Sequence, residues 1–313
     1  MKSSSSILVP ALLAGLSVVF CTLADPASSP IQGEMPSPLL VAGSARATLV
    51  GTDGKILWEQ KGCGNLHRTW LKDGWVYFSN NDLWRIQVST GKRELVYSPC
   101  PKDGLFGFEI LPNGNIVIAE NGTTYITELA AGTTNAVVRF QGDPRTIDGK
   151  MPGLHYRYRM IRKTSAGTYL VCCSGANAVR EFDQQGKLVW EQYAPRLKSG
   201  HSPLTFDVLR RENGNTVISH LGGITEYTPD HRAVWSFACA DFPELKLDNL
   251  CGIQELPNGN LVVGTYANGR PDGSRTTAFE ITRDKKIVWS YASTGDRNMM
   301  TAFRIDASDW PVR

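Results

Sequence analysis

Two adjacent cysteines, Cys172 and Cys173, stand in the segment TYLVCCSGAN, and neighbouring thiols can do several kinds of chemistry. They could form a strained redox disulfide, cover a cofactor, bind a metal ion or fill space in a buried strand. Side chains of adjacent residues in a regular strand point to opposite faces, so a bridge between them requires a distorted backbone. The local conformation of this segment therefore decides between these alternatives.

Histidine and arginine side chains are concentrated in three short segments, NLHRTW, LHYRYRM and GHSPLTFD. Imidazole and guanidinium groups that converge on one opening suit an anionic ligand such as a sulfate, a phosphate or a carboxylate. Aromatic neighbours would suit a sugar ring or a phenol. The alternative is that each side chain is exposed or bonded to a nearby carbonyl, because loop position alone is a weak indicator of function. The candidate binding residues are His67, Glu120, His155, Arg157, His201 and His220.

Motifs for other kinds of site are missing from the sequence. It contains no His-Glu-x-x-His segment, no Cys-x-x-Cys pair and no aspartate-rich calcium loop, so we predict no metal site. It also lacks a Gly-x-Ser-x-Gly nucleophile motif, and no catalytic residue is assigned. We predict no cofactor, with a quinone or a calcium ion kept as alternatives.

The elements that would position these residues follow from an internal repeat. The segment LPNGNIVIAENG at 111–122 returns as RENGNTVISHLG at 211–222 and LPNGNLVVGTYANG at 256–269. Each copy predicts two strands joined by a tight turn, because Asn-Gly flanked by β-branched residues is typical of a hairpin. A third and a fourth strand follow, and the fourth ends in an aromatic segment such as GKILWEQ or KKIVWSY.

The spacing of the copies predicts an all-β fold, a six-bladed β-propeller of four-stranded blades, since a period of about 40 to 50 residues is typical of such blades. The blades are expected at residues 39–60, 65–102, 105–142, 155–194, 204–242 and 247–291. The first lacks its inner strand, which the C-terminal segment MMTAFRID would supply. That strand would close the ring and remove an exposed sheet edge.

The propeller places the candidate residues at one face. Residues Asn80, Glu120, Cys173, His220 and Thr265 occupy the equivalent position near the end of the second strand of five blades. This position lies at the top face, where the inner strands begin, so we expect a polar mouth of the central channel there. Candidate disulfides are Cys63–Cys100, Cys239–Cys251 and Cys172–Cys173.

The N-terminus predicts export. Lys2, an apolar run at 7–20 and the small residue Ala24 are typical of a secretory signal, so residues 1–24 are expected as a signal peptide and 25–38 as a linker before a single propeller domain at 39–313. No later apolar run is long enough to span a membrane. The 33 basic and 30 acidic residues are interspersed, which argues against nucleic-acid binding. We expect a periplasmic or extracellular monomer.

The blade endings TDGKILW and DQQGKLVW resemble the repeats of quinoprotein-type propellers, and the LPNGN turns are similar to those of arylsulfotransferase-like bacterial propellers. The first resemblance implies a quinone covered by an adjacent-cysteine disulfide, for which Cys172 and Cys173 would serve. The second implies histidines that carry a sulfuryl group, for which His201 and His220 would serve with Arg157. Both resemblances rest on blade motifs, which specify a fold and not a chemistry.

Three functions fit these observations. The first is an exported binding or scaffold module whose top-face mouth takes a small molecule, a carbohydrate or another exported protein. The second is a transferase or hydrolase that acts on an anionic or carbohydrate substrate at the same mouth. The third is a quinone-dependent oxidoreductase. Whether the protein is an enzyme is left open by the sequence.

Overall fold

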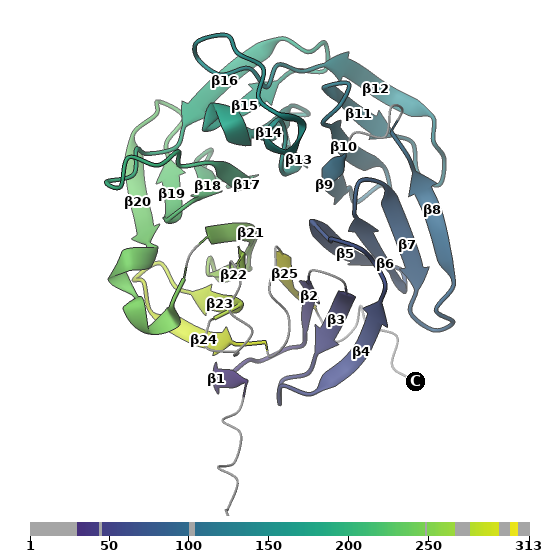
Figure 1. Cartoon of the computed structure of the whole chain (residues 1–313), viewed down its shortest axis with the longest axis vertical. Helices are drawn as coiled ribbons and strands as arrows, with labels where there is room; N and C mark the ends of the chain where they lie inside the picture. Colours follow the sequence, from purple (N-terminus) through teal and green to yellow (C-terminus); the bar gives the residue numbers. More distant parts are fainter. Residues whose placement is uncertain are drawn as a thin grey trace, which may run out of the picture.

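The computed structural model describes residues 30–43, 46–99, 104–247, 249–266, 276–293 and 301–305, and the predicted signal peptide lies outside them. Six antiparallel sheets stand around a common centre as the blades of a propeller (Figure 1). The predicted six-bladed fold is therefore confirmed. Within the described ranges no helix is long and apolar enough to cross a membrane.

Each blade runs from an inner strand beside the centre of the ring to an outer strand at its rim (Figure 1). Blade one holds β25 (Thr301–Arg304), β2 (Leu39–Ala42), β3 (Arg46–Val50) and β4 (Ile56–Lys61). Blade two holds β5 (Arg68–Lys72), β6 (Trp75–Ser79), β7 (Leu83–Gln87) and β8 (Arg93–Tyr97). Blade three holds β9 (Leu105–Ile110), β10 (Ile116–Glu120), β11 (Tyr125–Leu129) and β12 (Ala136–Gln141).

Blade four holds β13 (Ile161–Lys163), β14 (Tyr169–Cys173), β15 (Ala178–Phe182) and β16 (Leu188–Tyr193). Blade five holds β17 (Thr205–Arg210), β18 (Thr216–His220), β19 (Gly223–Tyr227) and β20 (Ala233–Ala238). Blade six holds β21 (Asn249–Glu255), β22 (Leu261–Tyr266), β23 (Ala278–Ile281), β24 (Ile287–Tyr291) and, outermost, β1 (Ile31–Gly33). Short 3-10 turns are η1 (Leu154–Tyr156), η2 (Ser174–Ala176), η3 (Cys239–Asp241) and η4 (Pro243–Leu245).

Both ends of the chain hold the ring closed. The C-terminal strand β25 pairs with β2, with Phe303 opposite Leu40, as the repeat predicted. The N-terminal strand β1 pairs with β24, with Gln32 opposite Ser290, and lies inside the segment expected as a linker. Blades one and six are thus each completed by a segment from the far end of the chain, which removes an open edge at the join.

The adjacent cysteines fill two different cores. Cys173 pairs with Ala178 and Cys172 with Val179 in an unbroken stretch of β14. The Cys173 side chain packs toward blade three, and the Cys172 side chain packs toward blade five. Both are buried free thiols, and burial raises the pKa of Cys173 to about 12. The Cys172–Cys173 disulfide is therefore not formed, because regular strand geometry points the two sulfurs apart.

The repeated Asn-Gly-Asn turn also supplies a contact between blades. Its second asparagine donates through Nδ2 to a buried glutamate on the third strand at 2.7 Å in three blades, as Asn115–Glu128, Asn215–Glu226 and Asn260–Glu280. For Glu128 and Glu280 the inner strand of the next blade then provides a cation. Lys163 Nζ lies 2.6 Å from Glu128, and Arg304 Nη1 lies 3.4 Å from Glu280. The repeat therefore specifies how blades pack together as well as the hairpin turn.

Replacing Glu280 by alanine tests this contact where the ring closes. The change leaves the donors of Asn260, Trp289 and Arg304 without their acceptor, so we expect unfolding free energy to fall by about 2–4 kcal/mol. Urea unfolding followed by tryptophan fluorescence measures this. The matched control Glu212→Ala changes an exposed glutamate and should leave stability near that of the wild type. Equal stabilities for the two variants would contradict the role of Glu280.

Candidate functional site

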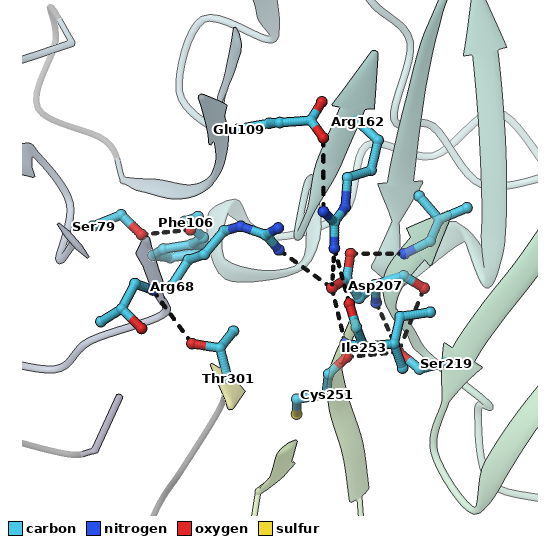
Figure 2. A network of polar contacts seen from close by, with 12 residues as sticks. Arg68, Ser79, Phe106, Glu109, Arg162, Asp207, Ser219, Cys251, Ile253 and Thr301 are labelled. Atoms are coloured by element: carbon cyan, nitrogen blue, oxygen red, sulfur yellow. Dashed lines mark hydrogen bonds and ion pairs between the residues drawn. The ribbon is translucent and has the colours of Figure 1, made fainter. Parts of the chain in front are cut away.

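Asp207 lies at the centre of the ring, where Figure 2 shows several blades meeting around its carboxylate. Its Oδ2 accepts from Arg68 Nη1 at 3.2 Å and from Arg162 Nη2 at 3.1 Å. The backbone N–H of Ile253 donates to the same oxygen at 3.0 Å, and that of Val208 donates to Oδ1 at 2.8 Å. One fully buried carboxylate thus joins the inner strands of blades two, four, five and six.

Further contacts bring in the remaining blades. Arg162 Nη1 lies 3.7 Å from Glu109 on β9, and Arg162 Nη2 donates to the carbonyl of Ile253 at 2.9 Å. The backbone N–H of Thr69 donates to Thr301 Oγ1 on β25 at 3.3 Å (Figure 2). Two guanidinium groups and two carboxylates balance in charge. Burial, and then the charge of Arg162, lower the pKa of Arg68 to about 10, so Arg68 remains a cation at neutral pH.

Arg159 lies nearer the top face, three residues before Arg162. Its backbone extends the pairing of β13, because the Arg159 N–H donates to Cys172 O at 2.9 Å and the Cys172 N–H donates to Met160 O at 3.0 Å. Gly107 on β9 allows blade three to approach this segment. A Cβ at Gly107 would lie 2.1 Å from Arg159 O, so no larger residue fits without a shift of the backbone. The start of the inner strand is thus fixed from two sides.

The Arg159 guanidinium is buried among rings. The residue is 5% exposed, and its Cζ lies 5.2 Å from the ring centroid of Phe106 and 6.0 Å from that of Phe206. Its Nη2 lies 2.6 Å from His155 Nε2. Because a guanidinium only donates, His155 Nε2 accepts this bond and the imidazole carries its proton on Nδ1. Arg159 Nε and Nη1 are buried and have no hydrogen-bond partner in the described part of the chain.

His67 completes this group, which we call the mouth cluster: Arg159, His67, His155, Phe106 and Phe206. The His67 ring lies 4.0 Å from that of Phe106 and 6.2 Å from that of His155. Burial, and then the nearby Arg159, lower the pKa of His67 well below its usual value and that of His155 to about 4. Both imidazoles are therefore neutral near pH 7. Among the described residues, no carboxylate pairs with Arg159, and the cluster has a net positive charge.

The structure brings together His67 and His155 of the predicted binding residues. Glu120 instead accepts from Tyr97 at 2.8 Å and from Arg139 at 3.0 Å, between blades two and three. Arg157 donates to the carbonyls of Asn121 and Gly122 at 2.9 and 2.8 Å and holds a connecting loop. Both side chains are thus engaged in contacts that stabilise neighbouring segments.

The remaining two predicted residues, His201 and His220, lie over blade five. They line a separate hollow of about 1120 Å³ together with apolar residues such as Leu197 and Phe237. His220 is buried, its Nδ1 donates to Leu221 O at 2.9 Å and its Nε2 accepts from Thr225 Oγ1 at 3.1 Å. His201 is exposed. These histidines therefore do not join the mouth cluster.

The other cysteines do not provide a redox site in the described residues. Cys251 is a buried free thiol beside Phe206, so it forms no disulfide with Cys239, and burial raises its pKa to about 12. Cys63 is a free thiol whose Sγ donates to Gln60 O at 3.3 Å. Its suggested partner Cys100 lies outside the described residues. Within those residues, no group of three histidine, cysteine or acidic side chains is placed to hold a metal ion.

The sequence places Arg68, Arg159 and Asp207 in the three segments expected at the mouth, but they were not selected as binding residues and the contacts around Asp207 were not predicted. The available signal was a charged residue within an otherwise apolar inner strand, as in LFGFEI, MIRK and TFDVL. In a closed ring such strands face the centre, where an ionised side chain needs a partner or a ligand. On that basis Glu109, Arg162 and Asp207 would have been predicted to meet.

Comparison with known proteins shows the fold. No family model matches the chain, and no curated protein matches it by sequence. A protein of unknown function from Bacteroides caccae superposes with a TM-score of 0.71 at 20% identity, covering 86% of this chain and 98% of that chain. A streptogramin B lyase superposes with a TM-score of 0.56 at 14% identity, covering 84% and 87%.

An extracellular domain gives a further match. It belongs to a hybrid two-component system protein from B. thetaiotaomicron and superposes with a TM-score of 0.53 at 13% identity, covering 86% of this chain and 35% of that chain. At these identities the likenesses show the β-propeller architecture alone. They do not identify a quinoprotein-type or an arylsulfotransferase-like family. Propellers similar in fold to this chain thus include an extracellular domain.

Replacing Asp207 by asparagine tests the network at the centre of the ring. The variant keeps the shape of the side chain but leaves two buried guanidinium groups without their shared counter-ion, so we expect a loss of about 3–5 kcal/mol in unfolding free energy. Urea unfolding measures the loss. The exposed Asp230→Asn serves as control. A D207N protein as stable as this control would show that the network contributes little to the fold.

The lowered pKa of His67 predicts a dependence of stability on pH. Below about pH 6.5 the unfolded chain binds a proton at this histidine and the folded protein does not, so stability falls by up to about 1.4 kcal/mol for each further pH unit. Unfolding free energies between about pH 7 and pH 5 measure the slope. The variant His67→Gln should lower the slope of unfolding free energy against pH by the contribution of about one proton, which is about 1.4 kcal/mol per pH unit. The same slope in both proteins would mean that His67 titrates normally in the fold.

Proposed function

We propose that this protein is an exported binding module that takes a small anionic ligand at the mouth cluster. The observation that carries the proposal is the buried Arg159 guanidinium, two of whose nitrogens have no hydrogen-bond partner among the described residues. Within the described ranges the one polar contact of this guanidinium is with a neutral imidazole, and the rings of Phe106 and Phe206 lie beside it. An anion would supply the missing charge and the missing acceptors.

The buried charge of Arg159 costs free energy in the absence of a ligand. Taking a cation out of water is expensive unless hydrogen bonds and an opposite charge compensate for it. The rings of Phe106 and Phe206 offset part of this cost through cation–π attraction. Burial lowers the pKa of Arg159, which is the direction expected for a cation whose charge is only partly compensated. A bound anion would therefore gain more free energy here than at an exposed arginine.

Binding is favoured over covalent catalysis by the state of the nearby groups. The Cys251 thiol near the cluster has its pKa raised to about 12, so it is not a thiolate at neutral pH. His155 Nε2 is engaged with Arg159 and is not free to accept a proton from a substrate. Export is supported by the N-terminal sequence pattern and by the similarity in fold to an extracellular domain.

Isothermal titration with acetate, benzoate, sulfate and phosphate tests this function. We expect at least one of these anions to bind, and Arg159→Met to weaken its binding at least about tenfold by removing a charged donor. The control Arg145→Met changes an arginine of the same connecting loop that is exposed and paired with Asp143, and it should bind as the wild type does. Equal losses in both variants, or no binding to the wild type, would contradict the proposal.

A further inference from the structure

Blade five has a hollow of about 1120 Å³ on the face that it turns toward blade four. Ile218 of β18 marks this face, because it packs with Cys172 of blade four. Thr225 lies opposite Ile218, and Ser236 lies opposite Thr225, so the three side chains point to the same side of the sheet. Thr225 and Ser236 line the hollow together with residues of the connection 194–204, which follows blade four. The hollow therefore lies between this connection and the outer half of blade five.

Short side chains on blade five leave this space open. In blades one, three and four the outer strand carries long side chains opposite the first and third residues of the third strand: Lys61 and Glu59, Gln141 and Arg139, and Tyr193 and Glu191. Blade five has Ala238 and Ser236 at these positions. In blade four, Arg180 Nε donates to Glu191 Oε1 at 2.6 Å, and Thr225 takes the place of that arginine in blade five. Blade five thus lacks the long side chains that cover this face in those blades.

The walls of the hollow are largely apolar. Leu197 extends from the connection over blade five, where a Cβ on Gly222 would lie 3.3 Å from Leu197 Cδ2. Leu221, Phe237 and Leu247 form further parts of the wall. Pockets for small organic molecules typically have about 300–1,000 Å³ and apolar walls with a few polar groups. The size and the walls of this hollow therefore suit the apolar body of an organic ligand.

The exposed part of the lining is basic. Arg196 and Lys198 are exposed and line the hollow, and within the described ranges neither side chain has an ion-pair partner. The exposed His201 lines it as well. Asp241 is the one carboxylate among the described residues of the lining. Two cations against one carboxylate give the lining a net positive charge, which attracts a ligand that carries an acidic group.

From these features we infer that the hollow is a second binding site, independent of the mouth cluster, and that it takes an amphipathic organic anion. The apolar body of the ligand lies against Leu197 and Phe237, in the space that long side chains fill in blades one, three and four. Its acidic group faces Arg196 and Lys198. The ring nitrogens of His220 are engaged with Leu221 O and Thr225 Oγ1, so this histidine serves as part of the wall.

Two fluorescent dyes test the ligand class, because they share an aromatic body and differ in charge. Anilinonaphthalene sulfonate carries one sulfonate, and phenylnaphthylamine carries no charge. Both dyes should bind the wild type. The double variant Arg196→Gln/Lys198→Gln should bind the sulfonate about tenfold more weakly and the neutral dye as before. The matched control Arg145→Gln/Lys150→Gln changes an exposed arginine and an exposed lysine of another connecting loop, and it should bind both dyes as the wild type does.

Filling the hollow tests the location of the site. Ala238→Tyr gives blade five the residue that blade four has as Tyr193, so both dyes should bind at least about tenfold more weakly. Ser236→Glu adds, at an exposed position, the residue that blade four has as Glu191, and it decides the location if Ala238→Tyr does not fold. Ala136→Tyr is the matched control, because it makes the same change at an exposed position of β12 outside the hollow. Urea unfolding shows which variants are folded.

The outcomes separate this inference from the proposed function. Unchanged dye affinities in the folded filling variants would overturn the location. Equal losses for both dyes in Arg196→Gln/Lys198→Gln would overturn the anionic class. Dye binding that is lost in Arg159→Met and kept in Ala238→Tyr would overturn the second site and support the mouth cluster instead. A wild type that binds neither dye would overturn the inference and leave the binding of small anions at the mouth cluster untouched.

Discussion

The arrangement of the inner strands at the centre of the ring depends on the hydrogen bonds that the carboxylate of Asp207 accepts. It accepts from Arg68 of blade two, from Arg162 of blade four and from the backbone of Ile253 of blade six (Figure 2). A ring of blades has no single core, since each blade packs only against its neighbours. This buried carboxylate adds a link between blades that are not neighbours, and Glu109 completes the balance of charge.

The same network explains why Arg159 has no counter-ion among the residues that the structure describes. The oxygens of Asp207 already accept four hydrogen bonds, and Glu109 accepts from the backbone of Lys163 and lies beside Arg162. Arg159 precedes Arg162 by three residues, which is about 10 Å along an extended strand. Its charge is therefore not shared with the network, and it faces the rings of the mouth cluster instead. The carboxylates that stabilise the centre are thus used up there, and the mouth cluster keeps the positive charge of Arg159.

The fold could be predicted from the sequence because the signals for it are local. An Asn-Gly turn sets a hairpin within a few residues, and its repetition fixes the number of blades and the closing strand. Strand geometry also argued against a bond between Cys172 and Cys173, although their disulfide was kept as a candidate, and the regular pairing of β14 decides against it. The strand β1 was not predicted, since three residues with no turn beside them have no periodic pattern.

The site could be predicted only in part, because it depends on contacts between blades. The segment LHYRYRM holds Arg157 and Arg159 two residues apart, and nothing in the pattern says which of them faces the centre. Arg157 bonds to loop carbonyls, while Arg159 enters the ring. His67 and His155 were both selected and lie close to each other, but their shared neighbour Phe106 comes from a third blade and was not selected.

A crystal structure with para-bromobenzoate tests the central claim most directly, because anomalous scattering from bromine locates the ligand without ambiguity. We expect a bromine peak at the top face near Phe106 and Phe206, with the carboxylate bonded to the Arg159 guanidinium. A ligand bound elsewhere at saturating concentration, with no ligand atom in contact with the Arg159 guanidinium, would contradict the proposed site.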